Sequence, residues 1–156
     1  MAASTQKGIV AVELALLLVP LTVILFGTVE LGRAFYQYET VVKSTRSAAR
    51  YLSVQTPGVG IPEAKCLAVA GTADAVTCSP ALVPALNTNM VTVRFIDGVS
   101  TCPAGIFTGC GAINLVEVCV NCPESAEKLQ FVSIAKWLVP DITLRAVRAV
   151  MRREGA

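Results

Sequence analysis

The most prominent feature of the hydrophobic pattern is one long apolar run near the N-terminus. From Ile9 to Gly27 the only charged residue is Glu13. An α-helix rises about 1.5 Å per residue, so a helix over this run approaches the thickness of the hydrocarbon core of a bilayer. The pattern therefore predicts one membrane-spanning helix over residues 9–27, with a carboxylate near one end that is costly to place in lipid.

Beyond Gly27 the pattern becomes amphipathic without a break. An apolar stripe recurs at alternating steps of four and three, as one helix face requires: Leu31, Phe35, Tyr38, Val42, Thr45, Ala49 and Leu52. Charged residues occupy the other faces, namely Glu30, Arg33, Glu39, Lys43, Arg46 and Arg50. We predict one continuous helix from about Ile9 to Ser53. The stripe suits packing on a partner helix, but packing on the chain's own domain is the simpler interpretation.

The rest of the chain predicts a small domain of helices and strands. The run Thr56-Pro57-Gly58-Val59-Gly60 ends the long helix, and residues 62–70 read as a short helix with proline in its first turn. Residues 72–89 read as a loop. Residues 90–96 and 113–120 alternate as two strands, which we expect to pair antiparallel.

The remaining segments are less regular. Residues 100–112 are rich in glycine and carry Cys102 and Cys110, so they read as a loop closed at its base by these cysteines. Residues 124–138 have helical spacing between two prolines. Periodicity alone leaves residues 142–151 open between a third strand and a helix. We expect an α+β fold, in which a long N-terminal helix continues into an amphipathic helix that packs on a small antiparallel sheet domain.

A basic start followed by an apolar run is also typical of a cleaved secretory signal. The run is longer than the usual signal core, and Phe26-Gly27-Thr28 matches a small-x-small cleavage site poorly. The helical pattern also continues past the end of the run. A retained span is therefore the favoured interpretation.

Composition narrows the function. The 156 residues allow one span and one domain of ordinary size, the formal net charge of +2 is scattered, and histidine is absent. All six cysteines lie beyond the span: Cys66, Cys78, Cys102, Cys110, Cys119 and Cys122. An even number on one side of the span predicts an oxidising compartment and up to three disulfides, whose pairing the sequence leaves open.

Catalytic chemistry finds little support in the sequence. Cys119-Val120-Asn121-Cys122 is a C-x-x-C motif, but it follows a strand and precedes Pro123, whereas redox motifs begin a helix. A zinc site would need four thiolates at irregular spacing, because no histidine is present. Phosphate loops and nucleophile elbows are missing. We expect no enzyme activity, no cofactor, no metal, no nucleic acid and no small-molecule substrate.

The N-terminus resembles a class III or type IV prepilin processing site. A short polar leader ends in Lys7-Gly8, and Glu13 is the fifth residue after the glycine. The resemblance implies that a prepilin peptidase cuts after Gly8 and leaves Ile9 as the new N-terminus. Glu13 can then pair with the free amine of a neighbouring subunit, which neutralises both charges in lipid or in a filament core.

Three further segments resemble the TadE-like family of tight-adherence (Flp) pilus proteins: residues 12–20, 26–34 and 47–51. The tail over residues 138–154 resembles the final strand of that family, which favours a strand over residues 142–151. The resemblance implies a minor pseudopilin of a type IVb adhesion pilus. The partners it implies are the membrane, the prepilin peptidase, the pilin, TadF- and TadG-like proteins and the inner-membrane platform.

These inferences divide the chain into a leader (1–8), a transmembrane helix (9–27), its amphipathic continuation (28–55) and a disulfide-containing periplasmic domain (56–156). The resemblance places the N-terminus in the bacterial cytoplasm, with the protein in the inner membrane and possible entry into the pilus. Charge counting alone favours the opposite orientation, because more basic residues follow the span than precede it. The alternatives are an unprocessed single-span assembly factor and, less favoured, a membrane-tethered thiol-disulfide oxidoreductase.

Overall fold

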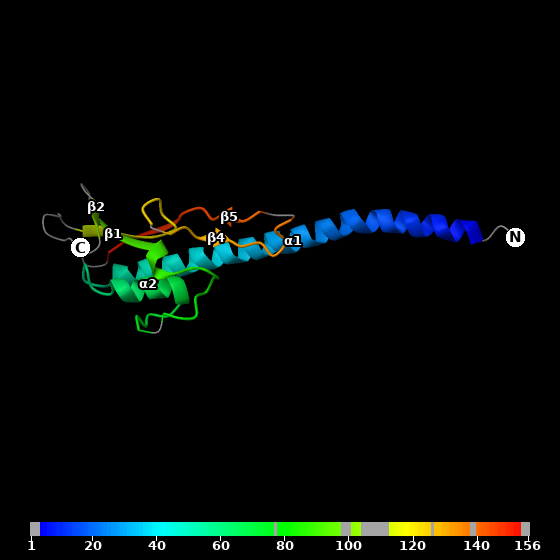
Figure 1. Cartoon of the computed structure of the whole chain (residues 1–156). Coiled ribbons are helices and arrows are strands. Elements are labelled where there is room, and N and C mark those ends of the chain that lie inside the picture. Colours follow the sequence, from blue (N-terminus) through cyan, green and yellow to red (C-terminus); the bar gives the residue numbers. More distant parts are fainter. Residues whose placement is uncertain are drawn as a thin grey trace.

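The computed structural model describes residues 4–76, 78–97, 101–103, 113–125, 127–137 and 140–153. The longest element is α1 (Ser4–Ser53). Its N-terminal half projects beyond the rest of the protein, and its C-terminal half lies against a small domain (Figure 1). The helix continues through Pro20. The prediction of one continuous helix and an α+β fold is confirmed, with the helix beginning earlier than expected, at Ser4.

The second helix, α2 (Ile61–Ala70), lies between two glycines in the left-handed region. Gly60 has φ 78° and Gly71 has φ 76°, conformations that glycine adopts without the steric cost of a Cβ atom. The Gly71 N–H donates to the carbonyl of Leu67 at 3.1 Å, which satisfies one terminal carbonyl of the helix. The helix expected over residues 62–70 is therefore confirmed, and its bounds follow from local chemistry.

A four-stranded sheet forms the body of the domain. Its strands are β2 (Thr101–Pro103), β1 (Val91–Asp97), β3 (Ile113–Val120) and β6 (Val147–Arg152), in that spatial order, and all neighbours are antiparallel. A 3₁₀ turn, η1 (Thr88–Met90), leads into β1. The expected antiparallel pairing of the first two predicted strands is confirmed. β2 forms at the start of the segment that we expected to be a loop.

The core lies between one face of this sheet and the two helices. Val93 of β1 is opposite Val118 of β3, which is in turn opposite Ala149 of β6, and all three are buried. Ala48 and Leu52 of α1 belong to the same buried cluster. Burying one large aliphatic side chain contributes about 1.5–3 kcal/mol, so this cluster accounts for the attachment of α1 to the domain.

The helix predicted over residues 124–138 is wrong. The described part of this segment contains no helix: it consists of irregular chain, turns at its two ends and the short strand β4 (Gln130–Phe131). Its burial alternates strictly: Leu129, Phe131, Ser133 and Ala135 are buried, and the residues between them are exposed. A period of two is the signature of extended chain. Apolar residues occur on both faces of the segment, and this gave its sequence a false helical spacing.

The strand expected over residues 142–151 is confirmed in type but divided in two. β5 (Ile142–Thr143) pairs antiparallel with β4 in a separate two-stranded sheet, and β6 begins only at Val147. Between them, the Leu144 N–H donates to the carbonyl of Leu129 at 3.0 Å. This contact draws the chain away from the main sheet before it returns as β6.

Candidate functional site

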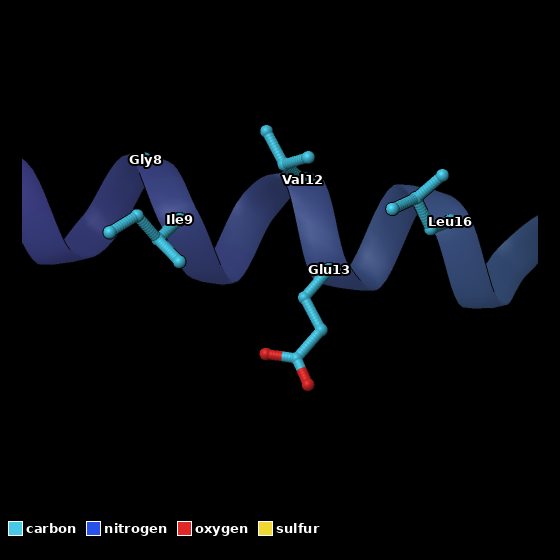
Figure 2. A pocket seen from close by; sticks show the side chains of 5 residues that line it. All are labelled: Gly8, Ile9, Val12, Glu13 and Leu16. Carbon is cyan, nitrogen blue, oxygen red and sulfur yellow. The ribbon is translucent and has the colours of Figure 1, made fainter.

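The N-terminal part of α1 carries the residues predicted for processing and subunit pairing. Gly8, Ile9 and Glu13 lie on consecutive turns of the helix and are exposed, and together with Val12 and Leu16 they line a shallow surface hollow. A Cβ at Gly8 would meet no atom within 4 Å. In Figure 2 the Glu13 carboxylate points away from the helix below the ribbon, whereas Val12 lies above it.

Within the described residues, α1 is the one helix long and apolar enough to cross a membrane, judged by length and composition. Except for the half-buried Val23, its large apolar side chains between Ile9 and Phe26 are exposed, from 48% at Leu18 to 71% at Leu16. Glu13 forms no hydrogen bond or ion pair with any described residue. The N-terminal half of α1 therefore offers an apolar surface with a single free carboxylate.

The stripe divides between two environments. Ala49 and Leu52 are buried in the domain core, as is Thr45, and Tyr38 and Val42 pack against its edge. Leu31 and Phe35 remain exposed, at 58% and 62%. These two line an apolar hollow of about 290 Å³ together with Ala34, Tyr38, Leu144 and Arg145. The C-terminal part of the stripe thus contacts the chain itself, and the N-terminal part is open to a partner.

Glu30 is a site residue that the sequence pattern missed. The pattern placed it on an exposed charged face, but it is only 5% exposed. Its Oε1 accepts hydrogen bonds from the backbone N–H groups of Ile134 (2.8 Å) and Ala135 (3.2 Å). Its Oε2 lies 3.3 Å from Nη1 of Arg33. The carboxylate is therefore fully engaged by one extended segment and one neighbouring side chain, a contact across more than 100 positions that periodicity cannot reveal.

Arg33 completes the attachment of that segment. Its Nη2 donates to the carbonyl of Val132 at 3.3 Å, and its guanidinium lies 5.2 Å from the centre of the Phe131 ring. A guanidinium over an aromatic face is attracted by the negative charge of the ring face. Glu30 and Arg33 thus fasten residues 131–135 to α1 just beyond the end of the apolar run.

Two disulfides join cysteines that were predicted as candidates. Cys66 pairs with Cys78, which ties α2 to the loop that follows it, and Cys119 pairs with Cys122 at the end of β3. Cys102 lies in β2, and Cys110 falls outside the described residues. The closing of the 100–112 loop by these two cysteines therefore stays a prediction.

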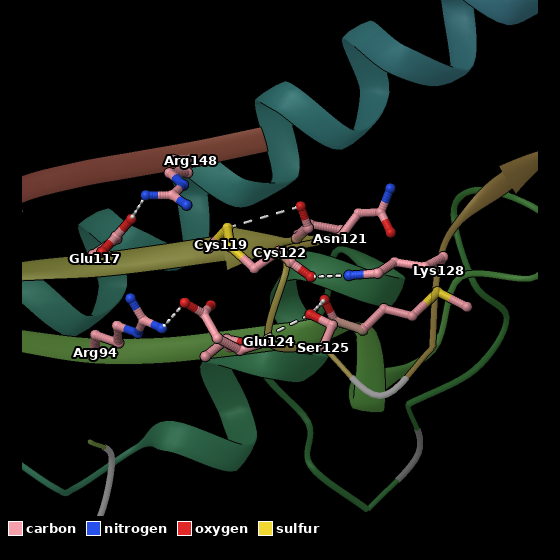
Figure 3. The surroundings of a disulfide bond; sticks show 12 residues. Arg94, Glu117, Cys119, Asn121, Cys122, Glu124, Ser125, Lys128 and Arg148 are labelled. Atoms are coloured by element: carbon pink, nitrogen blue, oxygen red, sulfur yellow. Dashed lines mark hydrogen bonds and ion pairs between the residues drawn. A yellow bond between two sulfur atoms is a disulfide. The ribbon is translucent and has the colours of Figure 1, made fainter. Parts of the chain in front are cut away.

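The C-x-x-C motif forms a turn built around Asn121. Asn121 is buried with φ 61°, and its Oδ1 accepts from the Leu129 N–H at 2.8 Å while its Nδ2 donates to the Leu144 carbonyl. Lys128 donates to the carbonyl of Cys122 (Figure 3). Cys119 and Cys122 are both buried, and the chain after them forms a turn. This arrangement is typical of a structural turn, because reactive cysteines are partly exposed to solvent and these two are not.

Two ion pairs lie on the sheet face opposite the helices. Arg94 pairs with Glu124, and Arg148 Nη1 lies 3.5 Å from Oε1 of Glu117 (Figure 3). The hydrogen bond from Arg94 lowers the pKa of Glu124, and the same bond raises the pKa of Arg94. Among the residues that the structure describes, no group of three His, Cys, Asp or Glu side chains could hold a metal ion.

Comparison with known proteins found one family. The family model described as "TadE-like protein" matches residues 8–50, which covers Gly8, Glu13, Glu30 and most of the stripe. The resemblance inferred from the sequence is therefore confirmed for this segment, whereas residues 51–156 lie outside the match. Neither the curated proteins nor the solved structures contained a match to the chain.

Proposed function

We propose, taking residues 8–50 as a TadE-like segment, that this chain is a minor pilin-like subunit required to assemble a Flp/Tad type IVb adhesion pilus. The family match supports a protein associated with the Tad pilus machinery, and α1 supplies a candidate membrane span. The proposed action is not enzymatic. The subunit works by helix–helix packing in the membrane or the filament.

One observation carries the proposal: α1 exposes apolar side chains from Ile9 to Phe26 and, among them, one carboxylate without a partner in the described chain. Lipid satisfies the apolar side chains but not an ionised carboxylate. A positive charge supplied by another molecule would neutralise Glu13. The free amine of a neighbouring subunit whose chain begins at Ile9 has the required charge and lies at a comparable depth.

The proposal includes processing and orientation. A prepilin peptidase cuts after Gly8, the N-terminal side faces the cytoplasm, and the α+β domain lies in the periplasm. The Cys66–Cys78 and Cys119–Cys122 disulfides support an oxidising compartment for the domain. The other proposed partners are the pilin, TadF- and TadG-like proteins and the inner-membrane platform.

The test combines a mass measurement with one substitution. We expect protein from native membranes to begin at Ile9, and Glu13→Ala to reduce surface pili to near background, because a subunit amine then lacks its counter-charge. Glu39→Ala, which removes an exposed glutamate from the same helix outside the apolar run, is the matched control and should leave piliation unchanged. Normal piliation by Glu13→Ala would contradict the proposed pairing.

A second candidate is an unprocessed single-span assembly factor of the same system. The hollow beside Leu31 and Phe35 favours it, because an apolar recess on α1 suits a partner helix without any need for cleavage. This role predicts an intact Met1 in the mass spectrum. It also predicts that Phe35→Ala impairs assembly more than Glu13→Ala.

A further inference from the structure

The extended segment over residues 128–137 changes character along its outward face. Lys128 and Gln130 are exposed at its beginning, whereas Val132, Ile134 and Trp137 are exposed at its end. Ile134 and Trp137 are 79% and 72% exposed. Large apolar side chains that cluster at the surface mark a contact with another molecule or a membrane. The outward face therefore becomes apolar in one direction along the segment.

That direction leads toward the apolar half of α1. In Figure 1 the orange segment between β4 and β5 reaches along α1 toward its N-terminal half, ahead of the rest of the domain. The Glu30 carboxylate accepts hydrogen bonds from the N–H groups of Ile134 and Ala135. Glu30 lies three residues after Gly27, which is about 4.5 Å along the helix axis. The apolar end of the segment is thus held at the height where the span leaves the hydrocarbon.

We infer that residues 132–137 dock on the lipid bilayer, with Ile134 and Trp137 in the headgroup region of the leaflet next to the domain. Tryptophan favours this depth, because its ring is apolar and its indole N–H reaches the polar layer. The segment and α1 then touch the membrane together. Because Glu30 and Arg33 hold the segment against α1, the contacts of the segment and of α1 with the membrane together fix the orientation of the domain relative to the membrane surface.

Two observations favour the bilayer over a second protein: the exposed apolar residues lie next to the candidate span, and the outward face becomes polar away from it. The apolar patch is next to the candidate span, so a membrane that surrounds residues 9–27 already reaches it. The outward residues farther from the span are polar. Lys136, whose side chain is mainly exposed, lies 3.4 Å from Asp141, so its charge is partly compensated beside the patch. The inference requires the span but not the pilus role.

The chain offers a direct probe, because Trp137 is its only tryptophan. The full-length protein is reconstituted in phosphatidylcholine vesicles, and carbonate extraction verifies that the span is inserted. We expect Trp137 emission to be quenched strongly by lipids brominated near the headgroup, weakly by lipids brominated near the chain end, and little by aqueous iodide. The matched control is the double variant Trp137→Phe with Val76→Trp, since Val76 is exposed on a loop of the domain. Its emission should show the reverse pattern.

Two outcomes would overturn the inference. One is quenching of Trp137 by iodide and not by brominated lipid in a protein that resists carbonate extraction. The other is protection from iodide that disappears when the protein is diluted in lipid, which would identify a second copy as the occupant. Ile134→Asp changes an exposed side chain and should reduce the lipid quenching of Trp137 without unfolding the domain. Processing at Gly8 is measured separately, so failure here does not bear on the pilus proposal.

Discussion

The two halves of α1 share one backbone geometry but have opposite surroundings. Between Ile9 and Phe26 nearly all of its large apolar side chains are exposed, whereas Ala48, Ala49 and Leu52 are buried against α2 and the sheet. In proteins a helix obtains most of its stability from the packing of its apolar face. The C-terminal half obtains that packing from its own chain. The N-terminal half has no such packing among the described residues, and its length and apolar composition suit a membrane span.

Two glutamates show the same difference at the level of single residues. Glu30 is buried, and its two carboxylate oxygens are engaged by backbone N–H groups and by Arg33. Glu13 is exposed and has no partner among the described residues. A buried carboxylate with its hydrogen bonds complete serves the fold. The proposed subunit pairing depends on the free carboxylate, so Glu13 and not Glu30 is the residue to test for assembly.

The largest expected effect is the loss of stability caused by truncating a leucine in the buried C-terminal half of α1. Leu52→Ala should lower the free energy of unfolding of the domain by about 2–5 kcal/mol, because it leaves a cavity in the core. Leu16→Ala, the matched control in the exposed half, should change that free energy by less than about 0.5 kcal/mol. Hydrogen exchange of the β3 amides in detergent micelles measures both. Equal protection in the two variants would contradict the proposed division of the helix.

A smaller effect is expected at the boundary between the halves. Glu30→Ala removes the acceptor of two backbone N–H groups, and each buried hydrogen-bonding group left unsatisfied costs about 1–3 kcal/mol. The loss should be local, with faster exchange at Ile134 and Ala135 and little change in β3. Glu39→Ala, an exposed glutamate on the same helix, is the control. Uniformly faster exchange throughout the sheet would show that Glu30 supports the whole core and not one segment.

The smallest expected effect is the contribution to stability of an ion pair in the domain, away from the exposed N-terminal half of α1. The hydrogen bond from Arg94 lowers the pKa of Glu124 below its ordinary value of 4.5. A carboxyl whose pKa is lowered by folding stabilises the fold above its unfolded pKa, and this stabilisation is lost as pH falls through the folded pKa. Both side chains are partly exposed to solvent, so the contribution is small.

Thermal unfolding from neutral pH into the acid range measures this contribution. Glu124→Gln should lower Tm slightly at neutral pH and converge with the unchanged protein at acid pH. Parallel pH profiles for the two proteins would mean that the ion pair contributes nothing measurable.

The sequence alone was sufficient to predict the elements that depend on local chemistry. The apolar run and the stripe predicted α1, proline in the first turn marked the start of α2, and alternation predicted β1 and β3. The TadE-like resemblance also rests on residues close together in the chain, and the family match covers that segment. These features depend on neighbours along the chain, which periodicity reads directly.

Tertiary structure decided what depends on contacts between distant residues. Residues 129–135 are extended because one face packs inward and because the side chains of Asn121 and Glu30 accept hydrogen bonds from backbone N–H groups of this segment. The sequence alone predicted a helix here, because apolar residues occur on both faces of the segment. The burial of Glu30 and the division of the last strand have the same origin. Glu13 is the opposite case: it has no partner among the described residues, and the proposed counter-charge comes from another molecule.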